Sequence, residues 1–240
     1  MAFFLEIDFM QLLVVVFCLI IFFYSLYILG KDDHVFIRKN LSLEQLFDIA
    51  FIGIFTGIIL ANILSFVFPT VKDMNIVVRL FSPTGAGFSL ISIILGYMLV
   101  LFLIGKYRKL PIARLSDFFS LALLSALPVG YFLSILFIKR SDIIYYIIPG
   151  IIYLVSQVFF WRFLLERVIS GKLRDGSLCS FFLVVFSVVS FFVHLFYKFT
   201  HAIKQIKVDE FILIGIFLCG LLFLLYTNRG QILRRRFNKT

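Results

Sequence analysis

His194 lies inside an otherwise apolar stretch, Phe191-Phe-Val-His-Leu-Phe196. Imidazole gains and loses a proton near neutral pH, which suits it to proton transfer. An ionisable side chain within a membrane helix faces the bundle interior more often than lipid, and it indicates a functional site by default. The alternative interpretation is a neutral histidine that is hydrogen-bonded inside the bundle and serves packing alone.

Two proline–glycine features, Pro128-Val-Gly130 and Pro149-Gly150, interrupt apolar stretches of the chain. Proline removes a backbone donor and bends a helix, and freed backbone groups in lipid are tolerated only against protein or a wet cavity. We therefore expect bent helices at these positions and a partly open site toward the outer leaflet.

The three cysteines show no spacing typical of metal ligands. Cys18, Cys179 and Cys219 each lie in or beside an apolar stretch, so we interpret them as small hydrophobic residues. The sequence predicts no disulfide framework, no metal site and no cofactor.

The composition predicts an integral membrane protein. Apolar residues make up 62% of the chain, charged residues 15%, and the mean hydropathy is +1.09, whereas soluble domains are about one quarter charged. With about 20 apolar residues needed for each crossing, 240 residues hold about seven helices and short connectors. The net charge of +10 resides at the ends of apolar stretches, which favours contact with anionic lipid headgroups and not nucleic acid.

We expect an all-α bundle that forms one transmembrane domain over residues 1–240. Alternation typical of a closed barrel is absent, so helices must satisfy the backbone in lipid. The expected spans are residues 9–29, 47–68, 86–104, 118–138, 143–165, 181–199 and 211–226.

The connectors predict the orientation of the chain. Lys and Arg are concentrated in alternate connectors, among them residues 106–117, and cytoplasmic loops carry the excess of these cations. The N-terminus is therefore expected outside and the C-terminus in the cytoplasm.

Local signals predict how the second and fourth helices begin. Ser42-Leu-Glu-Gln45 is a capping-box pattern, and Asp48 and Asp117 are expected to complement the positive ends of their own helices. Small residues recur every four positions in the second helix, which predicts a smooth face for close approach by a neighbouring helix. They are Gly53, Gly57, Ala61 and Ser65.

Three segments in the first half of the chain carry a resemblance to a known family. Leu46-Phe-Asp-Ile-Ala50, with the helix after it, is similar to a helix of that family that starts with Asp-Leu and ends in Gly-Gly-Arg-Leu-Gly-Tyr-Val. Residues 87–96 resemble its Gly-Leu-Ser-Phe-His-Gly-Gly-Leu-Ile-Gly, and the connector that ends at Asp117 resembles its Arg-Lys-x-Leu-Pro-x-x-Arg-x-x-Asp. The family is the prolipoprotein diacylglyceryl transferases of bacterial inner membranes.

The second half of the chain continues the resemblance. Ile148-Pro-Gly-Ile-Ile-Tyr153 is similar to the family's His-Pro-x-Gln-Leu-Tyr-Glu. Asp175-Gly-Ser-Leu178 through His194 resembles Pro-Gly-x-Leu through Arg-Phe-x-x-Glu. The periplasmic head of the family is reduced here to a few residues around 139–142.

The resemblance implies a reaction and its partners. A diacylglyceryl group moves from phosphatidylglycerol to the cysteine thiol of a prolipoprotein signal peptide, and glycerol phosphate is released. Such a transfer needs a base that forms the thiolate and fixed donors or cations at the departing phosphate. In this chain other residues would have to take these roles: His194 as the base, Tyr131 and Tyr153 as donors, and Lys139, Arg140 or Lys198 reaching the phosphate from the outer interface.

The positions that match the family's site carry mostly different side chains here. Tyr131 and Ser190 stand where the family has arginines, and Ile91 replaces its histidine. The loss of one preorganised donor often costs about 100-fold or more in rate. The alternative is therefore a non-catalytic lipid- or helix-binding protein of the same fold. The matching positions are Asn62, Ile91, Tyr131, Ser134, Tyr153, Ser190 and His194.

A carrier or channel is a third function class, and the sequence favours it least. Such proteins have rings of charged residues or paired broken helices in two repeated halves, and the spans of this chain contain neither.

Overall fold

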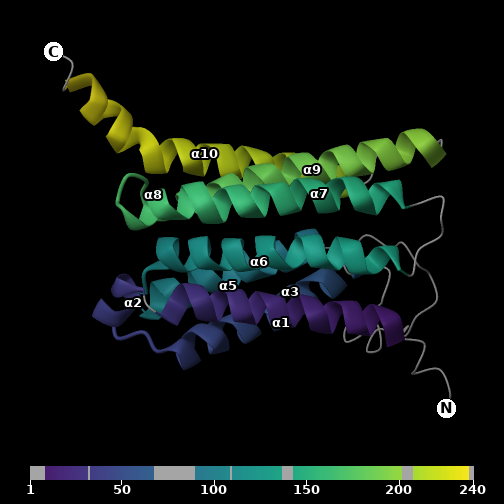
Figure 1. Cartoon of the computed structure of the whole chain (residues 1–240), viewed down its shortest axis with the longest axis horizontal. Helices are drawn as coiled ribbons and strands as arrows, with labels where there is room; N and C mark the ends of the chain where they lie inside the picture. Colours follow the sequence, from purple (N-terminus) through teal and green to yellow (C-terminus); the bar gives the residue numbers. More distant parts are fainter. Residues whose placement is uncertain are drawn as a thin grey trace. The chain divides into compact units, whose positions relative to one another are not determined.

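The computed structural model describes residues 9–31, 33–67, 90–108, 110–136, 143–201 and 208–237, and within these ranges the chain is helical with no strand. Figure 1 labels the main helices and colours the chain from purple at the N-terminus to yellow at the C-terminus. In chain order the elements are α1 (Phe9–Lys31), α2 (His34–Arg38), α3 (Leu43–Val67), α5 (Leu90–Arg108), α6 (Ile112–Ile135), α7 (Ile144–Phe159), the π-helical turn η2 (Phe160–Leu164), α8 (Leu165–Ile169), α9 (Ser177–His201) and α10 (Val208–Phe237).

Six helical segments in the described part of the chain are long and apolar enough to cross a membrane. They belong to α1, α3, α6, α7 with its continuation through η2 and α8, α9, and α10. The prediction of an all-helical, multi-pass membrane protein agrees with this result. The third expected span corresponds to α5, which is not among the six, and its residues 86–89 lie outside the described residues.

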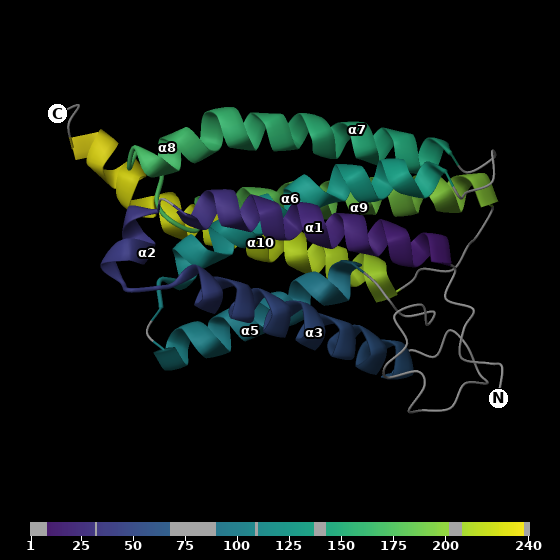
Figure 2. The same cartoon turned by 60° about the horizontal axis from the view of Figure 1, so that its bottom comes forward.

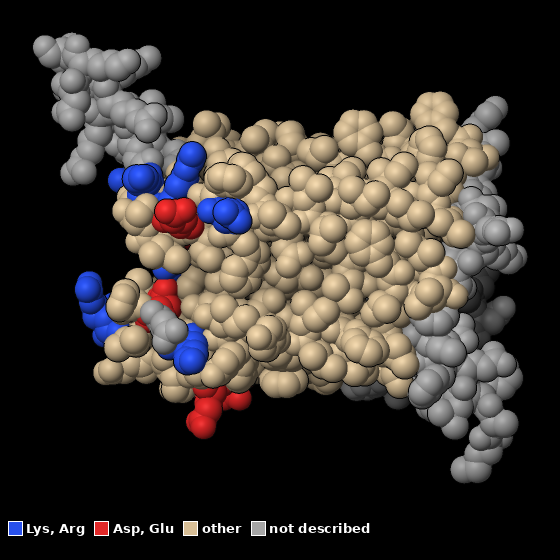
Figure 3. All heavy atoms as spheres, in the orientation of Figure 1, with Lys and Arg blue, Asp and Glu red and all other residues tan. Residues whose placement is uncertain are grey.

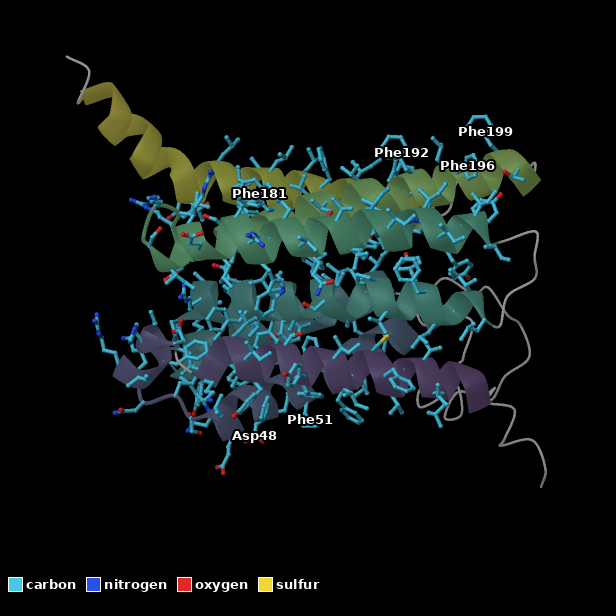
Figure 4. All side chains as sticks on the ribbon, in the orientation of Figure 1. Asp48, Phe51, Phe181, Phe192, Phe196 and Phe199 are labelled. Carbon is cyan, nitrogen blue, oxygen red and sulfur yellow. The ribbon has the colours of Figure 1, made fainter. Side chains whose placement is uncertain are left out.

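The outer surface of the helices is apolar. Phe192, Phe196 and Phe199 of α9 are exposed and lie along one side of that helix (Figure 4). In Figure 3, charged side chains lie near helix ends, while the rest of the visible described surface lacks them. Large apolar surfaces of this kind are stable in lipid, and charges at helix ends match the headgroup level.

The described residues form two compact units, of which the first comprises Met1–Leu29 and Ser116–Thr240. In this unit α9 and α10 pack against each other, and α9 also contacts α7. The aromatic ring of Phe22 in α1 lies 6.1 Å from that of Phe119 in α6. Near Pro128, the Cys18 thiol donates a hydrogen bond to the Ala126 carbonyl, with 3.7 Å between sulfur and oxygen. Cys18 thus serves packing in the described unit, as its apolar surroundings predict.

The second unit, Gly30–Leu115, is built around the close crossing of α3 and α5, which lie side by side in Figure 2. A Cβ atom on Gly96 would lie 2.5 Å from the Cα atom of Gly57, so only glycine permits this approach. The predicted smooth face of α3 is confirmed at Gly57. The predicted cap is confirmed as well, because the Gln45 amide donates to the Ser42 hydroxyl at 3.2 Å.

A buried ion pair holds the short helix α2 in the second unit. The Arg114 guanidinium donates to Asp33 Oδ2 from Nη2 at 2.7 Å and from Nε at 3.1 Å. The other carboxylate oxygen of Asp33 accepts from the amides of Val35 and Phe36, which caps α2. Because the acceptor capacity of Asp33 is filled by charge and by backbone donors, its carboxylate can remain buried.

Candidate functional site

Three of the matching positions meet in the first unit, although they come from three different helices. The ring of Tyr131 in α6 stacks on that of Tyr153 in α7, with 5.5 Å between centroids. The Tyr153 hydroxyl lies 3.4 Å from Ser190 Oγ in α9, within hydrogen-bond distance. We call Tyr131, Tyr153 and Ser190 the hydroxyl cluster.

Aromatic rings surround the hydroxyl cluster. Tyr146 lies 6.1 Å from Tyr131, and Phe186 stacks on Tyr153 at 6.5 Å, both measured between ring centroids. Tyr153 is fully buried and Ser190 is 9% exposed. Side chains therefore fill the space on the α9 side of Tyr153, and the two hydroxyl groups are shielded from bulk water.

The proline–glycine features lie within continuous helices. Pro128 is inside α6 and Pro149 is inside α7. A Cβ atom on Gly150 would come within 3.1 Å of the Phe132 ring, so the glycine leaves room for that ring between the two helices. At this level the interface of α6 and α7 is packed by an aromatic side chain.

Ser134 uses its hydroxyl within its own helix. Ser134 Oγ donates to the Gly130 carbonyl at 2.7 Å, one turn earlier in α6. Such a bond satisfies a serine inside an apolar helix. The structure therefore does not join Ser134 to the hydroxyl cluster by a hydrogen bond.

His194 lies one helical turn after Ser190 on α9 and is partly buried. Residues four positions apart share one helix face, so His194 extends the side of α9 that carries Ser190. A histidine and a serine on this face next to two tyrosines could exchange a proton with a bound thiol or hydroxyl.

The remaining candidate residues belong to the second unit or lie outside the described residues. Ile91 belongs to α5 in the second unit, where it is 4% exposed. The Asn62 and Lys198 side chains, and the residues Lys139 and Arg140, lie outside the described residues.

A carboxylate that the sequence assigned differently joins α6 to α9. Asp117 was expected to complement the start of its own helix, but its oxygens serve the start of α9. Oδ2 accepts from the Gly176 amide at 2.7 Å, and Oδ1 accepts from the Cys179 amide at 2.8 Å. Asp117 is fully buried, so both donors of the α9 terminus are satisfied without water.

A tryptophan marks the contact of α6 with the π-helical turn. Trp161 Nε1 donates to Ser125 Oγ at 3.1 Å, and Ser125 Oγ donates in turn to the Leu121 carbonyl at 2.9 Å. π-Helical turns often lie at functional sites because they redirect side chains. The sequence analysis missed both residues, since no local pattern predicts a contact across 36 positions.

No protein-family model matches the chain, and no curated protein or solved structure is similar enough to identify a relative.

Proposed function

We propose that this chain is a diverged prolipoprotein diacylglyceryl transferase of a bacterial inner membrane, with seven spans and a cytoplasmic C-terminus. The observation that carries the proposal is the hydroxyl cluster, because the resemblance assigns Tyr131, Tyr153 and Ser190 to one site from three separate segments. The contact of Asp117 with Gly176 supports the same alignment, since both residues belong to segments that resemble family motifs.

In the proposed reaction, His194 removes the proton from the lipobox cysteine thiol. The thiolate forms a thioether bond to the glyceryl carbon of phosphatidylglycerol, and the bond from that carbon to the phosphate oxygen breaks. Glycerol phosphate leaves with the bonding electrons. Tyr131 donates to the phosphate, and Lys139, Arg140 and Lys198 bind it from the outer interface.

Burial in the hydroxyl cluster favours a second candidate, a non-catalytic protein of the same fold that binds lipid or a partner helix. Tyr153 is fully buried under stacked rings. Its hydroxyl and that of Ser190 are neutral, so they stabilise a phosphate less than a planar guanidinium does. In this alternative, the hydroxyl cluster holds α6, α7 and α9 together and catalyses no reaction.

The two candidates differ in whether a thioether product forms. The full chain is reconstituted in phosphatidylglycerol vesicles with a lipobox peptide, and the modified peptide is measured by mass spectrometry. A transferase gives a product heavier by one diacylglyceryl group, and His194→Ala lowers its rate by about 100-fold or more. The matched control is His34→Ala, which alters an exposed histidine on α2 and leaves the rate unchanged.

The contrary result is equally clear. If the folded chain forms no thioether while an active transferase does so in the same vesicles, the transfer reaction is excluded and the non-catalytic candidate stands. If His34→Ala and His194→Ala lower the rate equally, His194 is not the base.

A further inference from the structure

A groove of about 660 Å³ runs between α3 and α5 of the second unit. Its walls are apolar, and they include Phe51, Ile52 and Leu103. Phe51 is 60% exposed and Leu103 is 56% exposed, so these side chains face an apolar phase outside the helices. An acyl chain fits walls of this kind.

The same groove is lined by two opposite charges. Asp48 belongs to α3, and Arg108 is the last residue of α5. The neighbouring Tyr107 also lines the groove and is 91% exposed. Figure 4 labels Asp48 and Phe51, which lie next to each other along α3. The chemistry of the groove is therefore an apolar wall with one anion and one cation at its polar end.

Helix geometry places the two charges at similar depth. Gly57 and Gly96 mark one common level, because their backbones touch there. Asp48 precedes Gly57 by nine residues, or about 14 Å, and Arg108 follows Gly96 by twelve residues, or about 18 Å. The charges thus lie within about one helical turn of each other along the groove.

Neither charge is neutralised within the described part of the chain, where Asp48 and Arg108 take part in no ion pair. Exposed carboxylates beside a lipid-facing wall need a cation or water, and guanidinium groups there bind phosphate well. A ligand that supplies a phosphate and an ammonium group satisfies both sides together.

We propose that this groove binds a zwitterionic aminophospholipid, with phosphatidylethanolamine as the matching chemistry. The phosphate contacts Arg108 and Tyr107, the ammonium contacts Asp48, and one acyl chain lies along Phe51, Ile52 and Leu103. Phosphatidylglycerol supplies no cation for Asp48, and the quaternary ammonium of phosphatidylcholine has no N–H donor. This inference is independent of the proposed transfer reaction.

Native mass spectrometry of the purified full chain tests the proposal. The protein is equilibrated with equal amounts of phosphatidylethanolamine, phosphatidylcholine and phosphatidylglycerol that carry the same acyl chains. One interfacial ion pair corresponds to a preference for phosphatidylethanolamine over phosphatidylglycerol of about two- to fivefold. Asp48→Asn is expected to abolish this preference, whereas Arg108→Gln weakens binding of all three lipids.

Two matched controls carry charges on the same helices but do not line the groove. They are Glu44→Gln in α3 and Lys106→Gln in α5, and both are expected to keep the preference. Leu103→Trp fills the groove and lowers binding of every lipid, whereas Leu99→Trp, at an exposed position elsewhere on α5, does not.

Several results would each overturn the proposal. They are equal or stronger binding of phosphatidylglycerol to the unaltered chain, a preference that survives Asp48→Asn, and an equal loss in Glu44→Gln. A co-purifying polypeptide cross-linked at Phe51 in place of lipid would also overturn it.

Discussion

Asp117 stabilises the start of a helix that lies 59 positions away in the sequence. Its removal would leave the amides of Gly176 and Cys179 buried without acceptors, which costs about 2 to 4 kcal/mol for two such groups. We expect Asp117→Ala to lower the midpoint of thermal unfolding of the purified protein by several degrees, and Asp117→Asn to lower it less because one oxygen remains.

Glu166→Gln is the control for Asp117→Ala, because Glu166 is an exposed carboxylate on α8. It should leave the unfolding midpoint unchanged. An Asp117→Ala protein as stable as the unaltered chain would show that water or a neighbouring group replaces the carboxylate.

The Asp33–Arg114 pair gives a second prediction at the level of single residues. Arg114→Gln leaves a buried carboxylate without its cation, so we expect a loss of about 3 to 5 kcal/mol in the free energy of unfolding. Because Asp33→Asn removes the same interaction, the double variant should lose less than the sum of the single variants. Denaturant unfolding of all four proteins measures the coupling, and strict additivity would contradict it.

The sequence predicted the polar contacts that are local. Ser42 and Gln45 are three positions apart, and their capping pattern follows from the order of residues alone. Arg114 and Asp33 are 81 positions apart, and Asp117 is 59 from Gly176. Such pairs depend on which helices become neighbours, which the order of polar residues along one helix does not specify. Tyr131, Tyr153 and Ser190, which the resemblance assigns to one site, lie together in the structure.

The close packing of α3 against α5 requires that position 96 carry no side chain. Gly96→Ala places a methyl group 2.5 Å from the Gly57 backbone, so the helices must move apart. We expect a lower unfolding midpoint even though alanine favours a helix by about 1 kcal/mol over glycine. The matched control is Gly215→Ala in α10, where a Cβ atom meets nothing within 4 Å.

Gly215→Ala should therefore leave the unfolding midpoint unchanged or raise it slightly. If Gly96→Ala behaves in the same way, the close crossing of α3 and α5 is not required for stability.

Trp161 offers a spectroscopic test of the contact between α6 and the π-helical turn. It is the only tryptophan of the chain, so the intrinsic tryptophan fluorescence reports this site alone. Ser125→Ala removes the oxygen that accepts the indole N–H, and we expect a shift of the emission maximum. Ser134→Ala alters a hydroxyl bonded within α6 and should leave the spectrum unchanged. Identical spectra for all three proteins would contradict the hydrogen bond.

For the whole molecule, the topology remains a prediction that accessibility can test. Cys18, Cys179 and Cys219 are replaced by alanine, and one new cysteine is introduced as Ser141→Cys or Leu110→Cys. The asymmetry of Lys and Arg predicts that only the first reacts with a membrane-impermeant maleimide on intact cells, and that the second reacts after the membrane is permeabilised. The reverse labelling pattern would show that the orientation is opposite to the predicted one. Equal labelling of the two cysteines on intact cells would place positions 110 and 141 on the same side of the membrane.

At this scale, composition predicted the class of protein. Long apolar stretches must form helices in lipid, and six described segments satisfy that condition. Composition does not predict the division into two compact units, because apolar side chains contact lipid and protein equally well. Small residues such as Gly57 and Gly96 indicate better than large apolar residues which helices pack closely together.

The π-helical turn between α7 and α8 keeps the buried side chains of this long element on one face. The buried residues of this element run from Tyr145 and Tyr153 to Phe160 and Val168. In an uninterrupted α-helix, the 23 steps from Tyr145 to Val168 would rotate the last side chain by about 140° from the first. The extra residue of the π-helical turn reduces this rotation by about 100°. The buried side chains thus stay on one side of the element along 26 residues, or about 39 Å. This length exceeds the thickness of the hydrocarbon layer of a membrane.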